Sequence, residues 1–333
     1  MTTIYLVRHA EAEGNAYRRI HGQYNSLITE NGLRQIEALT ERFRDIHIDA
    51  CYASDLYRTC KTAQAVYLAK NLPLHTDKRF REVSLGRWED VPFGYLERFE
   101  TQSMRQFNQD ERHWHIDGSE TWQEYTDRFL DGLNDVAQKH DGQTIAIFSH
   151  ACVLRGVQKR LLDTDDLIYC DNTAVSRVQY ENGTFTFDIL NDNSHLTPEI
   201  STQARQSAWK KGNTRADYSM WYERAPGEAE NYYSKLRDET AGSVTLCPAD
   251  TPEAGGILEM HMAPDRRGRA FGQQLLGQAV SIWRSRGAKR LQTTVPADND
   301  GALRFFKAHG FAEIRRDASG AHLEKDIEVH KLP

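Results

Sequence analysis

Two short apolar segments that each end at a histidine constrain the fold of this chain most strongly. The first, residues 4–7, is followed at once by Arg8 and His9, and the second, residues 144–149, by His150. Short apolar runs bounded by polar residues are typical of buried strands in a parallel sheet. Because functional groups gather at the carboxyl ends of such strands, the pattern predicts that these three side chains meet at one edge of a sheet.

Strand-like and helix-like segments alternate through the first half of the chain. Apolar residues recur at helical spacing after Asn31-Gly32, and Asn182-Gly183 is a strong hairpin turn. The alternation predicts an α/β domain with a mostly parallel sheet and helices on both faces. The segment 84–120 is polar and shows little periodicity. The predicted strands are 4–7, 50–53 and 144–149 with a hairpin at 174–190, and the predicted helices are 33–43, 55–69 and 121–139.

The chain of 333 residues is long enough for two domains. Residues 191–205 are polar and contain Pro198, which places a boundary near residue 200. We therefore expect one domain over 1–198 and a second over 199–333. Residues 205–240 are aromatic-rich and give no clear pattern. Beyond them the predicted strands are 241–247, 256–262 and 289–295, and the predicted helices are 270–286 and 299–309.

Charge limits the classes of partner. The net charge of -6 argues against a nucleic-acid-binding protein, which usually carries a basic patch. Residues 1–200 carry a net charge of -9 and residues 201–333 a net charge of +3. The asymmetry fits two units with different ligands and fits ordinary variation between halves equally well.

Membrane insertion, disulfide bonding and metal binding are not expected from the sequence. No apolar run approaches the ~20 residues that a bilayer-spanning helix needs. The five cysteines show no C-x-x-C spacing, which is typical of reduced thiols in a cytoplasmic protein. His113 and His115 flank Trp114 without carboxylate or cysteine spacing, so they indicate a substrate contact or plain surface and no metal site.

The strand-end histidines fit phosphoryl transfer through a covalent intermediate. That chemistry needs a nucleophile, positive donors around the phosphate and an acid for the leaving group. A neutral histidine attacks through one ring nitrogen while the other is held by a hydrogen bond. A single strand-end histidine is more often structural than catalytic, so the argument depends on the surrounding pattern.

In order and spacing, six segments of the first half resemble the histidine phosphatase family, which includes cofactor-dependent phosphoglycerate mutases and broad phosphatases. They read LVRHAEAEGN, LITENGLRQ, SDLYRTCKTA, REVSLGRWED, GSETWQEYTDR and FSHACVLRG. The resemblance covers about residues 1–195 and implies a three-layer α/β/α, phosphoglycerate mutase-like fold. It implies that His9 is the phosphorylated nucleophile and that Glu82 is the proton donor. The implied phosphate pocket consists of Arg8, Asn15, Arg58 and His150.

Some features depart from the usual family pattern. R-H-G is R-H-A here, and the aspartate that usually precedes the L-T-E segment is replaced around Asn25-Ser26. The long insertion of phosphoglycerate mutases, which ends in a proline run, is absent because residues 89–120 contain only Pro92. Water is then the expected final acceptor of the phosphoryl group, which favours a phosphatase over a mutase.

A phosphate-binding pattern also occurs in the second half. Residues 264–272, PDRRGRAFG, lead straight into a predicted amphipathic helix. A glycine-rich turn that opens a helix directs backbone N–H groups and the positive dipole end at an anion, although a basic loop with glycines for turn geometry would look the same.

The runs GILEMHMAPDRRGRAFGQQLL and NDGALRFFKAHGFAEI resemble the GCN5-related N-acetyltransferase (GNAT) superfamily. The resemblance implies a mixed-sheet α+β GNAT fold, with acetyl-CoA as cofactor and no metal. The implied cofactor-binding residues are Met260, Met262, Arg267, Gly268, Arg269, Ala270, Phe271, Gly272 and Asn299.

The residues for acetyl transfer are less defined. Amine attack on a thioester needs a route for the amine proton. The GNAT superfamily often has a tyrosine where this chain has Phe306, which carries no hydroxyl. Glu259 is a candidate catalytic base, with a mid-strand surface carboxylate as an equal alternative. His261 and His309 are further candidates.

These observations predict a bifunctional enzyme that hydrolyses a small phosphate ester through phosphohistidine and transfers acetyl from acetyl-CoA to a small amine. One alternative is an active phosphatase whose second half binds acetyl-CoA or docks without turnover. Another is a phosphohistidine-protein phosphatase, which would need an exposed site. The substrates and the oligomeric state stay open.

Overall fold

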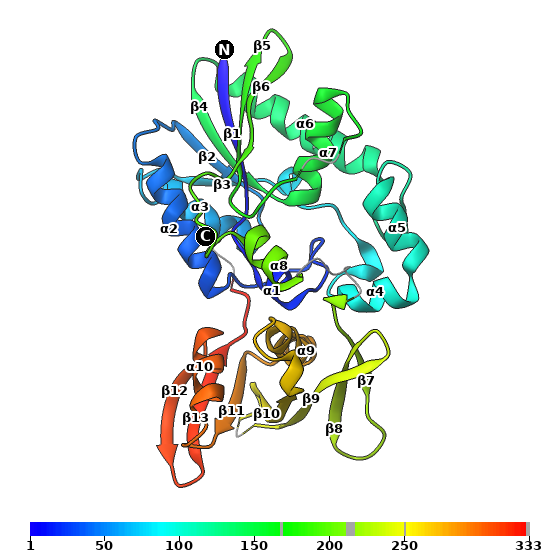
Figure 1. Cartoon of the computed structure of the whole chain (residues 1–333). Coiled ribbons are helices and arrows are strands. Elements are labelled where there is room, and N and C mark those ends of the chain that lie inside the picture. The colour runs from blue at the N-terminus through cyan, green and yellow to red at the C-terminus, as the bar shows by residue number, and fades with distance from the viewer. Residues whose placement is uncertain (167–168, 211–216, 250, 331–333) are drawn as a thin grey trace.

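The computed structural model describes residues 1–166, 169–210, 217–249 and 251–330. Figure 1 shows two units, with the N-terminal unit above the C-terminal unit, and each unit contains its own sheet. In the described ranges, no helix combines the length and apolar character that crossing a membrane requires.

The N-terminal sheet has six strands in the order β3-β2-β4-β1-β5-β6. The first four are parallel, β5 runs antiparallel to β1 and β6 runs antiparallel to β5, so the predicted mostly parallel sheet is confirmed. Asn182 and Gly183 both have positive φ, of 50° and 83°, as a tight hairpin turn requires. The strands are β1 (Thr2–Arg8), β2 (Ala50–Ala53), β3 (Leu74–Thr76), β4 (Thr144–Ser149), β5 (Val175–Glu181) and β6 (Thr184–Asp192).

Helices cover both faces of this sheet and make a three-layer domain. One core contains residues of α2 and α3 against one face, and a second contains residues of α6 and α7 against the other. Helix α7 follows His150 and was not among the predicted helices. The helices are α1 (Glu13–Tyr17), α2 (Glu30–Phe43), α3 (Tyr57–Tyr67), α6 (Trp122–Lys139) and α7 (Ala151–Leu162).

The segment 84–120, which lacks periodicity, contains two short helices, α4 (Phe93–Phe99) and α5 (Thr101–Gln109). Aromatic contacts hold this part together, since the ring centroids of Trp88 and Trp114 lie 5.0 Å apart. Packing between scattered aromatic residues therefore stabilises the segment 84–120, which we call the cap. Such packing leaves no regular period in the sequence.

The C-terminal sheet has seven strands in the order β12-β13-β11-β10-β9-β8-β7, and only the β10–β11 pair is parallel. The predicted mixed sheet is confirmed. The patternless region 205–240 contributes strands to it. The strands are β7 (Trp221–Arg224), β8 (Glu230–Leu236), β9 (Glu239–Pro248), β10 (Ala254–Met262), β11 (Arg290–Val295), β12 (Ala312–Asp317) and β13 (Gly320–Asp326).

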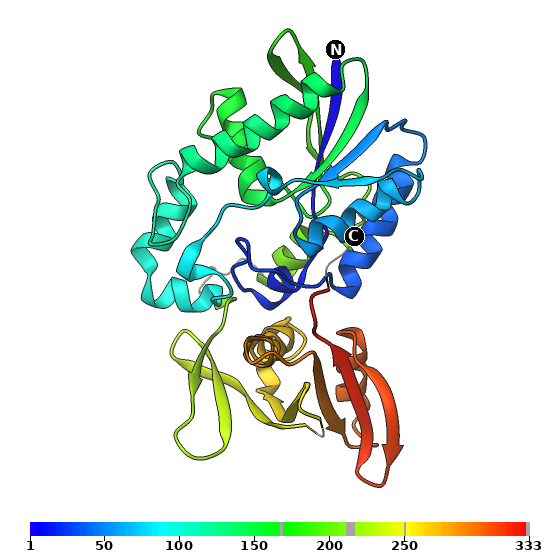
Figure 2. The same ribbon diagram turned by 180° about the vertical axis from the view of Figure 1, so that it is seen from behind.

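Helices α9 (Phe271–Ser285) and α10 (Asp300–Ala308) share one apolar core with this sheet. That core also includes Ala16 and Tyr17 of α1. Figures 1 and 2 show α9 between the C-terminal sheet and the N-terminal unit. Helix α8 (Thr202–Lys210) bonds to the N-terminal unit, where the Thr202 hydroxyl donates to Glu11 Oε2 at 2.9 Å. The two units therefore share a packed interface.

Candidate active site and cofactor cavity

The ends of β1 and β4 bring the two predicted histidines together. In the parallel register Arg8 lies beside Ser149, so His9 and His150 leave the sheet next to each other. Their ring centroids are 5.3 Å apart. The convergence predicted from the strand ends is confirmed.

His9 is held as a neutral imidazole. Its Nδ1 lies 2.7 Å from the carbonyl oxygen of Ala10, and because a carbonyl only accepts, the proton is on Nδ1 and Nε2 keeps its lone pair. The side chain is 2% exposed. Burial, followed by the charges of Arg58 and Arg8, holds its pKa well below the usual value for histidine.

Arg58, near the start of α3, is fully buried beside the two histidines. Its Nη2 and Nη1 donate to the carbonyl oxygens of Gly22 and Tyr24 at 2.7 and 2.9 Å, and its Nε donates to Nδ1 of His150 at 3.2 Å. His150 Nε2 in turn donates to Ser54 Oγ at 2.9 Å. Burial lowers the pKa of Arg58 to about 10, so it stays charged at neutral pH. With both its nitrogens engaged, His150 orients Arg58.

Glu82 lies at the N-terminus of α7. Its carboxylate accepts hydrogen bonds from the backbone N–H of Val153 at 2.8 Å and of Cys152 at 3.1 Å. It also acts electrostatically on Arg58, which places it at the same site. These hydrogen bonds fix the Glu82 carboxylate at the start of α7.

Arg8 and Asn15 complete the predicted set. Arg8 Nη1 donates to the carbonyl oxygen of Cys170 at 2.6 Å, and its buried Nε has no partner in the part of the chain that the structure describes. Asn172 Nδ2 donates to the His9 carbonyl at 2.9 Å and, at 3.4 Å, to Oδ1 of Asn15. With its oxygen engaged, Asn15 presents its NH2 group as the available anion donor.

His21 is a third histidine at this site, and it was missed from the sequence. Its ring centroid lies 5.9 Å from that of His9. Its Nε2 accepts from the backbone N–H of Gly14 at 3.0 Å, so the ring proton is on Nδ1. Burial keeps its pKa well below the ordinary value. The local sequence around His21 shows no recognisable pattern, because His21 reaches the site through a loop that is closed by hydrogen bonds.

A cavity of about 580 Å³ opens between β10, the start of α9 and α10. It brings together most of the residues that the GNAT resemblance implies. Those that line it are Met260, Met262, Arg267, Gly268, Ala270, Gly272 and Asn299. Asn299 Oδ1 also accepts from the Ala302 N–H at 3.0 Å and so caps α10.

Three predicted residues lie outside this cavity. Phe271 is 1% exposed and belongs to the apolar core, because its position on α9 faces the sheet. Arg269 lines a separate polar cavity with Arg237 and Arg266. Glu259 is exposed next to a β-bulge in β10, which turns it away from the cavity wall. None of these three side chains lines the cavity, so the cofactor contacts of Arg269 and Phe271 and the catalytic role of Glu259 stay predictions.

The cavity wall on α10 is aromatic. Phe305, Phe306 and His309 line it, and the rings of Phe305 and His309 lie 4.4 Å apart. His309 Nδ1 donates to the Phe305 carbonyl at 2.7 Å, which leaves Nε2 as an acceptor. Burial lowers the pKa of His309, so its imidazole is neutral at neutral pH.

Comparison with known protein families finds one matching family for each half of the chain. Residues 4–193 match the family model of the histidine phosphatase superfamily (branch 1), and residues 198–311 match that of the acetyltransferase (GNAT) family. Across the described residues, no group of three or more His, Cys, Asp or Glu is arranged to hold a metal ion.

Individual relatives align with the N-terminal half. The probable phosphoglycerate mutase GpmB of Proteus mirabilis is 30% identical over 206 residues, which are 59% of this chain and 96% of that protein. Phosphoserine phosphatase 1 of Hydrogenobacter thermophilus is 28% identical over 59% of this chain and 95% of its own length. Bacillus stearothermophilus YhfR superposes with a TM-score of 0.57 at 28% identity, over 59% of this chain and 99% of its own. The chain therefore belongs to the histidine phosphatase superfamily and continues into a GNAT-family domain.

Proposed function

We propose that the N-terminal half hydrolyses small phosphate monoesters through a phosphohistidine at His9. His9 Nε2 attacks phosphorus, a P–N bond forms, the ester P–O bond breaks, and Glu82 protonates the leaving oxygen. Water then attacks phosphorus and gives its proton to Glu82 as the P–N bond breaks and phosphate leaves. The observation that carries this proposal is the 2.7 Å bond between His9 Nδ1 and the Ala10 carbonyl, which leaves Nε2 unprotonated beside Arg58.

The choice of a small ester and of water as acceptor rests on the site. His9 is almost completely buried, which disfavours a phosphohistidine on another protein as the substrate. The long insertion of phosphoglycerate mutases is absent from 89–120. We also propose a cytoplasmic location, because all five cysteines are free thiols.

Hydrolysis of p-nitrophenyl phosphate tests this proposal directly. The full chain is expected to release p-nitrophenol, and His9→Ala is expected to lower kcat by about 10⁴-fold or more, because the covalent route is lost. His47→Ala, which changes an exposed histidine outside the site, is the matched control. Activity that survives in His9→Ala would show that His9 is not the nucleophile.

We further propose that the C-terminal half binds acetyl-CoA and acetylates a small amine. The cavity holds the glycine-rich turn at the start of α9, where backbone N–H groups and Arg267 are available to a pyrophosphate. His309 lines the cavity with a free Nε2, so it is better placed than Glu259 to accept the amine proton.

Calorimetric titration with acetyl-CoA and a thiol-release assay over a panel of amines separate the two hypotheses for this half. Binding together with turnover, reduced at least about tenfold in His309→Gln, would support the transferase. Binding without turnover of any amine would favour the regulatory or docking module.

A further inference from the structure

One helix of the C-terminal domain, α9, lines the acetyl-CoA cavity and also packs against α1 of the N-terminal domain. Its first turn carries Gly272 and Gln273, which line the acetyl-CoA cavity. Gln273 Nε2 also donates to the carbonyl oxygen of Ala16 at 2.9 Å, in a buried position. Ala16 belongs to α1, the short helix that follows His9 in the sequence.

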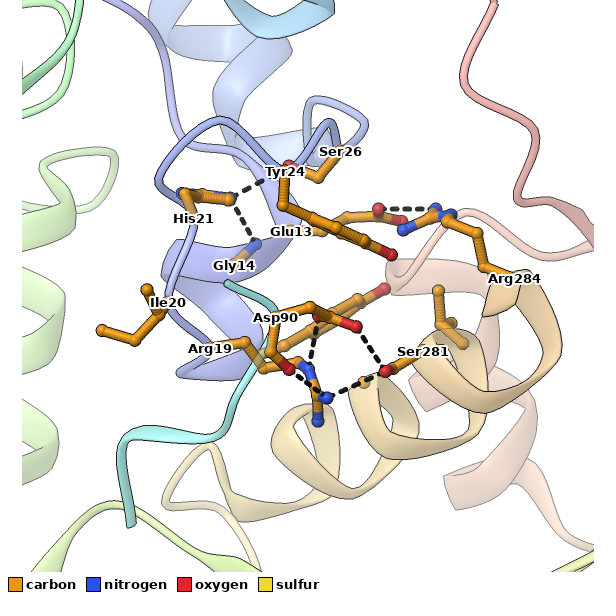
Figure 3. A pocket seen from close by; sticks show the side chains of 13 residues that line it. Glu13, Gly14, Arg19, Ile20, His21, Tyr24, Ser26, Asp90, Ser281 and Arg284 are labelled. Carbon is orange, nitrogen blue, oxygen red and sulfur yellow. Dashed lines mark hydrogen bonds and ion pairs between the residues drawn. The ribbon is translucent and has the colours of Figure 1, made fainter. Parts of the chain in front are cut away.

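The charged contact between α9 and α1 is the ion pair of Arg284 with Glu13, drawn in Figure 3. Arg284 Nη2 donates to Glu13 Oε2 at 2.8 Å, and the Glu13 side chain is 3% exposed. Lys325 Nζ lies 3.8 Å from the other carboxylate oxygen. A buried carboxylate without its partner is strongly unfavourable, so the position of α1 depends on residues of the C-terminal domain.

A second polar cluster fixes the loop after α1. Arg19 Nη1 donates to Gln278 Oε1 at 2.9 Å, and Arg19 Nη2 donates to Ser281 Oγ at 2.8 Å. Ser281 and Arg19 both bond Asp90 of the N-terminal domain, as Figure 3 shows. Helix α9 thus holds Glu13, Ala16 and Arg19, and Arg19 lies just before His21 in the sequence.

On its other side, the same segment reaches the phosphate site. Asn15 lies on α1 and is linked through Asn172 to the His9 backbone. The N–H of Gly14, also on α1, donates to His21 Nε2. The histidine phosphatase family model matches residues 4–193, so α9 lies outside the region that it matches.

We propose that Arg284 and Gln273 are positioning residues of the phosphatase, which set the place of Asn15 and His21 beside His9 by holding α1 from outside. The inference rests on the proposed phosphatase function. It assigns part of the phosphate site's geometry to a helix of the acetyltransferase domain.

The test uses Arg284→Met in the full chain, with orthovanadate affinity measured by calorimetry alongside kcat/KM for p-nitrophenyl phosphate. We expect both quantities to fall by about tenfold or more, because a displaced α1 misplaces the anion donors. The acetyl-CoA dissociation constant is expected to change less than about twofold. Arg286→Met is the matched control, since Arg286 follows the same helix but pairs with the partly exposed Glu230.

The double variant Glu13→Gln, Arg284→Met separates positioning from folding. It removes the charges of Arg284 and Glu13 and leaves Lys325 charged, so its Tm is expected to recover in part while its vanadate affinity stays low. If Arg284→Met does not fold, the vanadate affinity of the double variant tests the inference in its place. Vanadate affinity equal to that of Arg286→Met, in either Arg284 variant, would overturn the inference. A wild-type chain that binds vanadate but hydrolyses no ester would contradict the proposed function alone.

Discussion

At the scale of single residues, the buried hydrogen bond from His150 to Ser54 is the outermost link of the phosphate site. Ser54 Oγ is the acceptor for His150 Nε2, and His150 Nδ1 accepts from Arg58. The orientation of the Arg58 guanidinium, which would neutralise a bound phosphate, therefore depends through His150 on the Ser54 hydroxyl.

Ser54→Ala tests this link. The variant leaves a buried N–H without an acceptor, so the free energy of unfolding is expected to fall by about 1–3 kcal/mol. The kcat/KM for p-nitrophenyl phosphate is expected to fall as well, because Arg58 loses a fixed neighbour. Urea denaturation and steady-state kinetics measure the two effects. Ser285→Ala, on the exposed end of α9, is the control and is expected to shift stability by less than about 0.5 kcal/mol.

At the scale of elements, the turn before α9 is the part of the cavity that we propose binds the pyrophosphate. Gly268 has φ of 69° and lines the cofactor cavity, whereas Gly287, beyond the other end of α9, has φ of 83° and lies outside it. A Cβ at either position would meet no atom within 4 Å. The two glycines therefore share the same backbone requirement and differ only in their distance from the cavity.

Replacing each of these glycines by alanine separates strain from ligand contact. Both variants are expected to lose about 1 kcal/mol of stability, since a left-handed φ disfavours a side chain. Only Gly268→Ala is expected to weaken acetyl-CoA binding, by about tenfold, because its methyl group enters the cavity. Thermal denaturation and calorimetric titration give the two values. Equal affinity for acetyl-CoA in both variants would contradict the pyrophosphate turn.

The predictability of the fold differs between elements for physical reasons. The strands at 50–53 and 144–149 were predicted with their observed bounds, because buried parallel strands are continuous apolar runs. The cap helices α4 and α5 were missed because scattered aromatic contacts, which have no fixed period, stabilise them.

The same distinction applies to the sites. Arg8, His9 and His150 were found because strand ends converge in a parallel sheet. His21 was missed because it depends on a loop hydrogen bond to Gly14. Phe271 was assigned to the cofactor because a motif does not say which side chains point into the core.

At the scale of the whole molecule, the buried His9 and His150 and the partly buried His21 link folding to pH. Burial holds the pKa of His9, His21 and His150 well below the usual 6.5. Below about pH 6.5 the unfolded chain binds more protons than the folded chain, so the free energy of unfolding falls as the pH decreases. Each histidine contributes up to about 1.4 kcal/mol per pH unit in that window.

Urea denaturation between about pH 5 and pH 7 checks this linkage. His21→Gln is expected to reduce the slope of stability against pH by up to about 1.4 kcal/mol per unit, since one partly buried titrating group is removed. His113→Gln changes an exposed histidine and is the control. A slope that is the same in both variants would contradict burial of His21 in the folded protein.

Helix α9 also limits how this pair of domains can evolve. Domains joined by recombination are often exchangeable, but here Ala16 and Tyr17 complete the core of the second unit, and Glu13 finds its counter-ion there. Replacing either half by a distant homologue would leave apolar residues without their packing partners or a buried charge without its counter-ion. Inherited changes at Glu13 and Arg284 are therefore expected to occur together, and the two halves are best regarded as one unit of selection.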